Sequence, residues 1–414
     1  MTSHASRPVR RRKVFYIPGY DPFPPRRYRE LYRKESAVQA AISGYDIALK
    51  PGAPGGGYRW QVAARIDGLP ALTDVEVLVW SDIVRDSRPN SVLRTYRDLL
   101  RTAWIYISTG ALFRLMRLRK GPVIAALYPV FLLLAQAGLA LGLGWAMVRI
   151  VQRMGMEISG DTSALVSLGA APMGVAVAGL TLRWFRENDA RFFAYYLMHD
   201  FAFSAAQRGA YPPELEARLH SFTARISDAL QEDIDEVLVV GHSSGAYLGV
   251  SALADLLRGR DLSDHRPVLG FLSLGQVVPM VSFLPQAQRL RRDLRHVSQR
   301  ADLTWVDVTA PGDGCSFALC DPVGVSGQAT PDRHGPLVFS AAFTQSLSPA
   351  RWKSLRWRFF RLHFQYLCAF DRPKDYDYFQ ITAGPQTLKA RYADRVPSKS
   401  RMDASVTGFH SVET

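Results

Sequence analysis

The sequence predicts an α/β fold in which a mostly parallel sheet is covered by helices on both faces. Apolar segments of strand length alternate with segments of helical period through the second half of the chain, and strands that alternate with helices form parallel sheets. Two long uncharged runs between residues 123 and 182 predict that a pair of membrane helices is inserted into this fold.

The strands and helices follow from the apolar pattern. A strand at 14–17 ends at Pro18-Gly19, and a helix rich in Arg and Tyr covers about 26–43. A buried strand is expected at 75–80, followed by one long basic helix that leads toward the first uncharged run. Beyond the second run, the expected order is a helix at 213–231, a strand at 236–240, a helix at 246–257, a strand at 268–274, a helix at 286–299 and a strand at 303–308. The segment 381–384 is left open as a last strand or a loop.

Residues 123–148 and 164–182 carry no charged side chain, and about 20 apolar residues in a helix cross a bilayer core. The linker between them is short, so they form a hairpin and both flanking parts of the chain lie on one side. The positive-inside tendency assigns this side to the cytoplasm, because it carries Arg114, Arg117, Arg119, Lys120, Arg183 and Arg186. The alternative is a pair of helices buried in a soluble core, although such helices usually show a polar stripe.

The net charge of +14 favours an acidic partner, and both nucleic acid and an anionic membrane are candidates. The chain shows no zinc-finger spacing and no aromatic RNA-binding motif, and its basic residues flank the uncharged runs. We therefore expect membrane lipids and no nucleic acid as partners. The three cysteines are too few for a disulfide framework. Cys315 and Cys320 lack the His or Cys neighbours of a metal site, so neither a metal nor a cofactor is expected.

The expected organisation has four parts. Residues 1–121 and 184–387 form the two halves of the α/β domain, which faces the cytoplasm. Residues 122–183 form the transmembrane hairpin between them. Residues 388–414 form a basic, partly disordered tail.

The strongest chemical signal is Gly241-His242-Ser243-Ser244-Gly245, between an apolar strand and a helix. In this setting the pattern describes a sharp turn that exposes the central serine at a helix N-terminus, where the dipole favours negative charge. The alternative is an ordinary Gly/Ser turn that caps a helix. The segment VLVVGHSSGAYLG resembles the nucleophile elbow of the α/β-hydrolase family. The resemblance implies that Ser243 is the nucleophile and that the backbone N–H of Ser244 stabilises the oxyanion.

A second oxyanion donor in that family comes from a loop after an early strand. The segment VFYIPGYDPF resembles this loop, which implies the backbone N–H of Tyr20 as the donor. The alternative is a plain Pro-Gly turn. The side chain of Tyr20 is not expected to be catalytic.

The family order is serine, then acid, then histidine. Asp313 follows the strand at 303–308 on a loop and is favoured as the acid over Asp307, which lies inside that strand. His363 is favoured as the base, because it leaves room for a helix after Asp313 and its aromatic surroundings shield it from water. His334, which follows Asp313 more closely in a Pro/Gly-rich stretch, is the reserve.

Together these residues predict a membrane-anchored serine hydrolase that cleaves a carboxylic ester through an acyl-enzyme on Ser243. A position beside the bilayer favours a lipid-like ester. Two other functions stay open: an acyltransferase that uses the same triad, and a membrane scaffold that keeps the fold without the chemistry.

Overall fold

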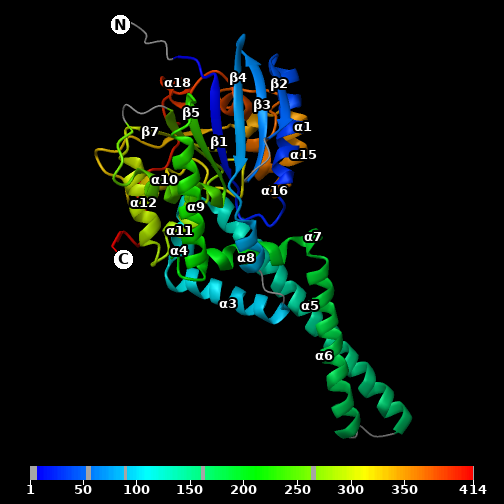
Figure 1. Cartoon of the computed structure of the whole chain (residues 1–414). Coiled ribbons are helices and arrows are strands. Elements are labelled where there is room, and N and C mark those ends of the chain that lie inside the picture. Colours follow the sequence, from blue (N-terminus) through cyan, green and yellow to red (C-terminus); the bar gives the residue numbers. More distant parts are fainter. Residues whose placement is uncertain (1–6, 53–56, 88–90, 160–163, 263–266, 414) are drawn as a thin grey trace. The chain divides into compact units, whose positions relative to one another are not determined.

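The computed structural model describes residues 7–52, 57–87, 91–159, 164–262 and 267–413. The chain divides into two compact units (Figure 1). The first, which we call the sheet unit, comprises Met1–Asp86, Tyr106–Val123 and Gln207–Thr414. The second, the helical unit, comprises Ser87–Ile105 and Ile124–Ala206.

An eight-stranded sheet forms the sheet unit's centre, in the order β2-β3-β4-β1-β5-β6-β7-β8. Its strands are β1 (Arg11–Ile17), β2 (Asp46–Pro51), β3 (Tyr58–Ile66), β4 (Leu69–Val77), β5 (Glu236–His242), β6 (Val268–Leu274), β7 (Leu303–Thr309) and β8 (Leu337–Ser340). β2, β3 and β4 pair antiparallel, and every other neighbouring pair is parallel. The chain is therefore an α/β protein with a mostly parallel sheet flanked by helices, as the sequence predicts.

β1 and β5 are neighbours at the centre of this sheet, and their register pairs Ile17 with Gly241. Every residue of β5 is buried, as expected for a central parallel strand that is covered on both faces. Parallel strands end at the same edge of the sheet. The turn after β5 therefore lies beside the Pro18-Gly19 turn after β1.

Helices cover both faces of the sheet (Figure 1). In chain order the helices are α1 (Arg26–Ser43), α2 (Ser81–Ser87), α3 (Val92–Ser108), α4 (Ala111–Leu118), α5 (Lys120–Ser159), α6 (Ala164–Glu187), α7 (Asp189–Phe192), α8 (Ala194–Ala205), α9 (Pro213–Ala229), α10 (Ser244–Leu257), α11 (Val278–Ser282), α12 (Gln288–Ser298), α13 (Pro322–Val325), α14 (Phe343–Ser346), α15 (Pro349–Leu355), α16 (Phe359–His363), the 3₁₀ helix η1 (Phe364–Leu367), α17 (Tyr378–Ala383) and α18 (Leu388–Arg391). Successive side chains of a strand face opposite sides. Accordingly Ile17 faces Gly249 of α10, whereas Tyr16 packs in a core cluster with residues of α1 and α17.

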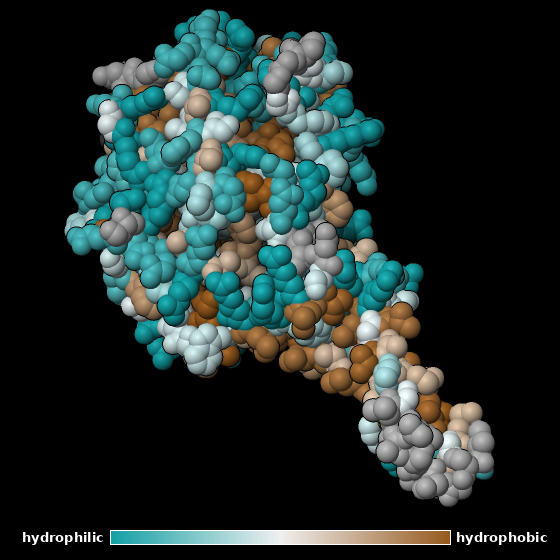
Figure 2. All heavy atoms as spheres, turned by 60° about the horizontal axis from the view of Figure 1, so that its bottom comes forward, coloured by the Kyte–Doolittle hydropathy of each residue, from teal (hydrophilic) through white to brown (hydrophobic). Residues whose placement is uncertain are grey.

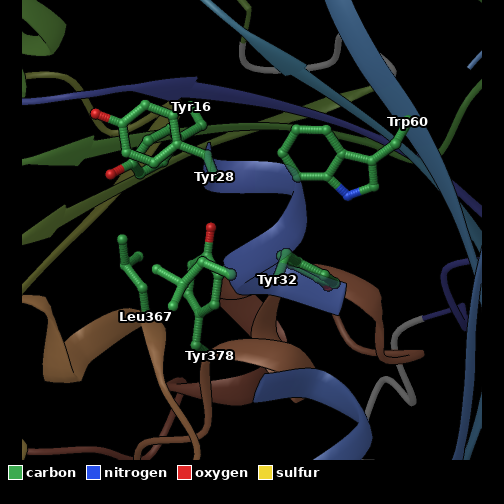
Figure 3. Close-up of a pocket in the computed structure, with 7 residues that line it drawn as sticks. Tyr16, Tyr28, Tyr32, Trp60, Leu367 and Tyr378 are labelled. Carbon is green, nitrogen blue, oxygen red and sulfur yellow. The ribbon is translucent and has the colours of Figure 1, made fainter. Parts of the chain in front are cut away.

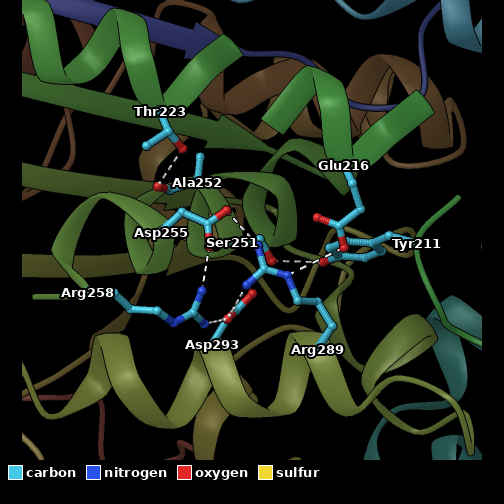
Figure 4. A network of polar contacts seen from close by, with 9 residues as sticks. All are labelled: Tyr211, Glu216, Thr223, Ser251, Ala252, Asp255, Arg258, Arg289 and Asp293. Carbon is cyan, nitrogen blue, oxygen red and sulfur yellow. Dashed lines mark hydrogen bonds and ion pairs between the residues drawn. The ribbon is translucent and has the colours of Figure 1, made fainter. Parts of the chain in front are cut away.

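A polar network joins α9, α10 and α12 on the face of the sheet that α10 covers (Figure 4). Arg289 of α12 lies 2.6 Å from Asp255 of α10 and 2.9 Å from Asp293, and it approaches Glu216 of α9 at 3.5 Å. Arg258 bonds both aspartates as well. Burial raises the pKa of Asp293 to about 6 against the opposing charges of the two arginines. Breaking one partner of such a buried network leaves an uncompensated charge, so the network holds α10 firmly against α12.

A small aromatic cavity lies on the opposite face (Figure 3). It is lined by Tyr16, Tyr28, Leu31, Tyr32, Trp60, Leu367 and Tyr378. Its volume of about 10 Å³ is close to the room that one water molecule needs. The Tyr16 hydroxyl and the Trp60 indole N–H are both buried without a partner among the described residues. The cavity is too small for an organic ligand.

The helical unit contains the two uncharged runs, in α5 and α6. Within the described residues, one helix, α5, is long and apolar enough to cross a membrane, by length and composition alone. The two helices approach closely, because a Cβ on Gly144 of α5 would lie 2.6 Å from the carbonyl oxygen of Gly174 of α6. Such contacts between small residues are common in membrane helix pairs. Figure 2 shows hydrophobic side chains on the surface of this pair.

Two helix predictions are wrong. The expected single basic helix is broken at Gly110, whose φ of 70° is left-handed, and becomes α3 and α4. The first apolar helix does not stop at the charges after 148, because α5 continues to Ser159 and includes Arg149 and Arg153. Residues 160–163 of the predicted linker lie outside the described residues.

The tail, which the sequence predicts to be partly disordered, makes backbone hydrogen bonds to the rest of the sheet unit within the described residues 388–413. After α18, the backbone N–H of Ser398 donates to the carbonyl of Val338 at 3.0 Å, and that of Met402 donates to Leu319 at 2.7 Å. These bonds attach a polar segment to β8 and to the loop after β7, although its composition resembles that of a disordered chain. The segment 381–384, left open above, belongs to α17 and the residue after it.

Candidate active site

Ser243 lies on the turn between β5 and α10 with φ 57° and ψ −121°. This conformation costs a non-glycine residue about 1–3 kcal/mol and persists only where the surroundings enforce it. β5 and α10 fix both sides of the turn, and the Ser243 N–H donates to the carbonyl of Leu274 in β6 at 2.9 Å. Ser243 is half-buried, whereas its neighbours His242 and Ser244 are buried. The turn therefore presents the serine at the N-terminus of a 14-residue helix.

Two glycines allow the β1 turn to approach this serine. A Cβ on Gly19 would lie 2.9 Å from the Cβ of Ser243, and a Cβ on Gly245 would lie 2.1 Å from the carbonyl oxygen of Ile17. Neither position accepts a side chain without displacing the backbone. The indole N–H of Trp80 donates to the carbonyl of Pro18 at 2.9 Å, which holds the turn after β1 in place.

Asp313 and His363 form a direct hydrogen bond, although 50 positions separate them in the chain. Nδ1 of His363 lies 2.8 Å from Oδ2 of Asp313. The backbone N–H of Cys315 donates to the other carboxylate oxygen at 2.9 Å. Asp313 lies on the loop after β7, and His363 is the last residue of α16. Both side chains are buried, so their bond is shielded from water.

The charge of Asp313 determines which ring nitrogen of His363 carries the proton. Burial by itself would raise the pKa of Asp313, but the charge of His363 and its hydrogen bond hold that pKa below the ordinary value. An ionised carboxylate only accepts hydrogen bonds. Nδ1 of His363 therefore carries the proton, and in the neutral ring Nε2 is the basic nitrogen. Nε2 is buried and has no hydrogen-bond partner among the described residues.

Two contacts place His363 next to the Ser243 turn. Its ring lies 4.8 Å from the ring of His242, centroid to centroid, and its carbonyl oxygen lies 3.0 Å from Nε2 of His242. On the other side, a Cβ on Gly275, the residue after Leu274, would lie 3.1 Å from Cε1 of His363. The structure thus gathers Ser243, His363 and Asp313 at one edge of the sheet.

His242 is a neutral neighbour of His363. Burial, followed by the charge of His363, lowers the pKa of His242 to about 3. The carbonyl oxygen of His363 can only accept, so Nε2 of His242 donates to it. His242 therefore fixes the backbone of His363 to the end of β5 and does not compete with it as a base.

Tyr366, which follows His363 on η1, did not emerge from the sequence. Its hydroxyl donates to Oδ2 of Asp313 at 3.0 Å, the oxygen that also binds His363. The side chain is buried and packs 4.9 Å from the ring of Phe343. The only sequence signal for this contact is that Tyr366 lies three positions after the candidate base His363. The sequence does not reveal which way the tyrosine hydroxyl points.

If the chain carries out the ester hydrolysis that the sequence predicts, Tyr366→Phe is expected to lower turnover by about 10- to 150-fold, because a hydrogen bond to a charged group contributes about 1.5–3 kcal/mol. Turnover and melting temperature are measured together. The matched control is Tyr376→Phe, since the Tyr376 hydroxyl donates to the backbone carbonyl of Tyr366 at 2.6 Å and not to Asp313. Equal losses of turnover in the two variants would mean that Tyr366 acts only through packing.

The alternative residues lie elsewhere. Asp307 is fully buried within β7, accepts a hydrogen bond from the Ser273 hydroxyl at 2.5 Å, and has its pKa raised to about 8 by burial. His334 is exposed, and its backbone N–H donates to the carbonyl of Ser298. The Tyr20 side chain is buried edge-on against Trp80, so only its backbone remains a candidate for the site.

A metal could also be held here. Asp313, Cys315 and His363 each offer one ligand atom, and these atoms lie within 4.8 Å of one another. The 2.8 Å between Nδ1 of His363 and Oδ2 of Asp313 is the length of a direct hydrogen bond. In this structure the two side chains therefore bind each other directly.

Comparisons of the chain with protein-family models, with curated proteins and with solved structures find no match.

Proposed function

We propose that this chain is a membrane-anchored serine hydrolase of the α/β-hydrolase type that cleaves a carboxylic ester. The proposal rests above all on the buried bond between Asp313 and His363 beside the strained turn of Ser243. Structural ion pairs occur throughout proteins, but this pair leaves a buried, unpartnered Nε2 on a histidine whose ring packs against His242, the residue before the half-buried Ser243. That arrangement provides a nucleophile, a base and a group that orients the base.

In the proposed mechanism, Nε2 of His363 takes the hydroxyl proton as Oγ of Ser243 bonds to the ester carbonyl carbon. Asp313 stabilises the resulting imidazolium through Nδ1. The imidazolium then gives its proton to the alcohol oxygen as the carbon–oxygen bond breaks, which leaves an acyl-enzyme. Water, deprotonated by the same nitrogen, then attacks the acyl carbon. As the bond between that carbon and Oγ breaks, the imidazolium returns its proton to Oγ, which releases the acid and free Ser243.

Backbone N–H groups of Ser244 and Tyr20 are proposed to stabilise the oxyanion. Ser244 is the first residue of α10, where N–H groups point out of the helix and the dipole is positive. A Cβ on Gly19, the residue before Tyr20, would lie 3.4 Å from Oγ of Ser243. This close approach supports the choice of the β1 turn as the second donor.

The anchor is proposed to be the hairpin of α5 and α6, with the sheet unit on the cytoplasmic side. Large apolar side chains of α5 are exposed, including Phe131 at 74%, Leu141 at 69% and Trp145 at 68%. A helix in water usually buries such side chains, whereas acyl chains would cover them. A position at the bilayer favours a lipid-like ester as substrate.

The test is covalent labelling of native membranes with a fluorophosphonate probe, which reacts with activated serines. The intact protein is expected to be labelled at Ser243, as identified by peptide mass spectrometry, and prior heat denaturation should prevent the reaction. A folded protein that stays unlabelled at neutral pH would contradict the hydrolase proposal and favour a membrane scaffold.

A further inference from the structure

Helix α3 carries an apolar stripe on its outward face. Leu93, Leu100 and Trp104 are 81%, 67% and 70% exposed. Spacings of seven and four residues place all three on one side of a helix. The outward side of a helix in water is normally polar, so this stripe requires a different environment.

The stripe is not the packing face of α3, because the helix already has one. Leu99 is buried in a cluster with Leu133 of α5 and with Ala194, Tyr195 and Met198 of α8. The Tyr96 hydroxyl also donates to the carbonyl oxygen of Leu133 at 2.8 Å. These contacts all lie within the helical unit. α3 therefore has a buried side that binds its neighbours and an opposite, exposed apolar side.

Arginines flank the stripe. Arg94, Arg97 and Arg101 are exposed, and Asp98 is the only acidic residue of α3. Arg97 lies 3.8 Å from Asp98, and Arg101 donates to the carbonyl of Ala206 at 2.6 Å. An exposed apolar stripe bordered by basic side chains is typical of helices that lie in the interface of an anionic membrane.

We infer that α3 lies flat in the headgroup region of the bilayer, with Leu93, Leu100 and Trp104 in the acyl boundary and its arginines on anionic lipid phosphates. The contact of Leu99 and Tyr96 with Leu133 fixes the depth of α3 relative to α5. From Leu133 to Arg153, whose charge belongs at the far interface, about 20 residues of α5 remain, or roughly 30 Å at 1.5 Å per residue. That length crosses a hydrocarbon core of about 30 Å. This inference rests on the proposed membrane anchor and is independent of the hydrolase chemistry.

The test uses the full chain in phosphatidylcholine vesicles, whose lipids carry bromine at a shallow or at a deep position of the acyl chain. Bromine quenches tryptophan fluorescence on contact. The signals of Trp104 and Trp145 are obtained by subtracting the spectra of Trp104→Phe and Trp145→Phe from that of the unchanged protein. Shallow bromine is expected to quench Trp104, and deep bromine is expected to quench Trp145 of α5.

A second variant tests the charges. Arg94→Gln with Arg97→Gln is expected to weaken shallow quenching of Trp104 in vesicles that contain anionic phosphatidylglycerol, and to leave it unchanged in neutral vesicles. Quenching of Trp145 without quenching of Trp104 would overturn the inference and keep the anchor. An absence of quenching at both positions would overturn the anchor itself. An unchanged signal in the arginine variant with anionic lipid would overturn the role of the charges.

Discussion

Ser243→Ala is expected to abolish both fluorophosphonate labelling and ester turnover. Removal of the nucleophile from a serine hydrolase lowers turnover by about 10³–10⁶-fold, because the remaining oxyanion donors and substrate binding contribute only a residual rate. The variant should fold normally. Alanine keeps the backbone N–H that donates to Leu274, and it adopts the positive φ at a cost similar to that of serine.

The matched control is Ser244→Ala, at the next position of the same turn. Its backbone N–H, the proposed oxyanion donor, is retained, so most of the turnover should remain. Both variants are compared with the unchanged protein in melting temperature, in membrane fraction and in hydrolysis of a short-chain ester. Undiminished labelling in Ser243→Ala would show that the turn after β5 is not the reactive site.

The central part of the fold was predictable because its signals are local. The apolar run of β5, the Gly-x-Ser-x-Gly turn and the start of α10 are contiguous in the sequence, and each segment has the period of its structure. Asp313 could be selected over Asp307 because a residue on a loop after a strand is free to face the site. A residue inside a buried strand is held among apolar neighbours, and the raised pKa of Asp307 reflects this.

Most of the antiparallel edge of the sheet escaped prediction for physical reasons, and the strand expected at 75–80 overlaps only the end of β4. β2 is an edge strand whose residues are mostly exposed, so it lacks an apolar run. β3 and β4 do carry a signal: Asp67 and Gly68 between them both have positive φ, and an Asp-Gly pair favours a tight hairpin turn.

The contacts of Tyr366 with Asp313 and of the tail with β8 could not be predicted from the sequence for another reason. They join segments far apart in the chain, and composition records neither the direction of a hydroxyl nor the partner of a backbone N–H. A basic, polar tail resembles a disordered segment until its N–H groups find carbonyls on a folded domain. The sequence therefore predicted the strand, turn and helix around Ser243 better than the long-range contacts around Asp313.

His363→Ala is expected to lower ester turnover by several orders of magnitude, because no other basic group could take the Ser243 proton in the proposed mechanism. His242 cannot replace it, since burial and the neighbouring His363 lower the pKa of His242 to about 3 and its Nε2 is engaged by a carbonyl oxygen. The substitution also removes a partner of Asp313, so some thermal stability should be lost. His363→Gln is therefore measured in parallel, because its amide can donate to Asp313 but cannot serve as a base.

His334→Ala is the matched control, since His334 also follows Asp313 in the order of the family and is the reserve candidate for the base. Its side chain is exposed and its backbone bond to Ser298 survives the substitution, so turnover should stay within about twofold. Turnover, labelling rate and melting temperature are compared for the three variants. If His334→Ala removed turnover while the His363 variants lost only thermal stability, the base would have to be reassigned to His334. A loss of turnover in His363→Gln at an unchanged melting temperature would separate the chemistry of His363 from its packing, because only the basic nitrogen would then be missing.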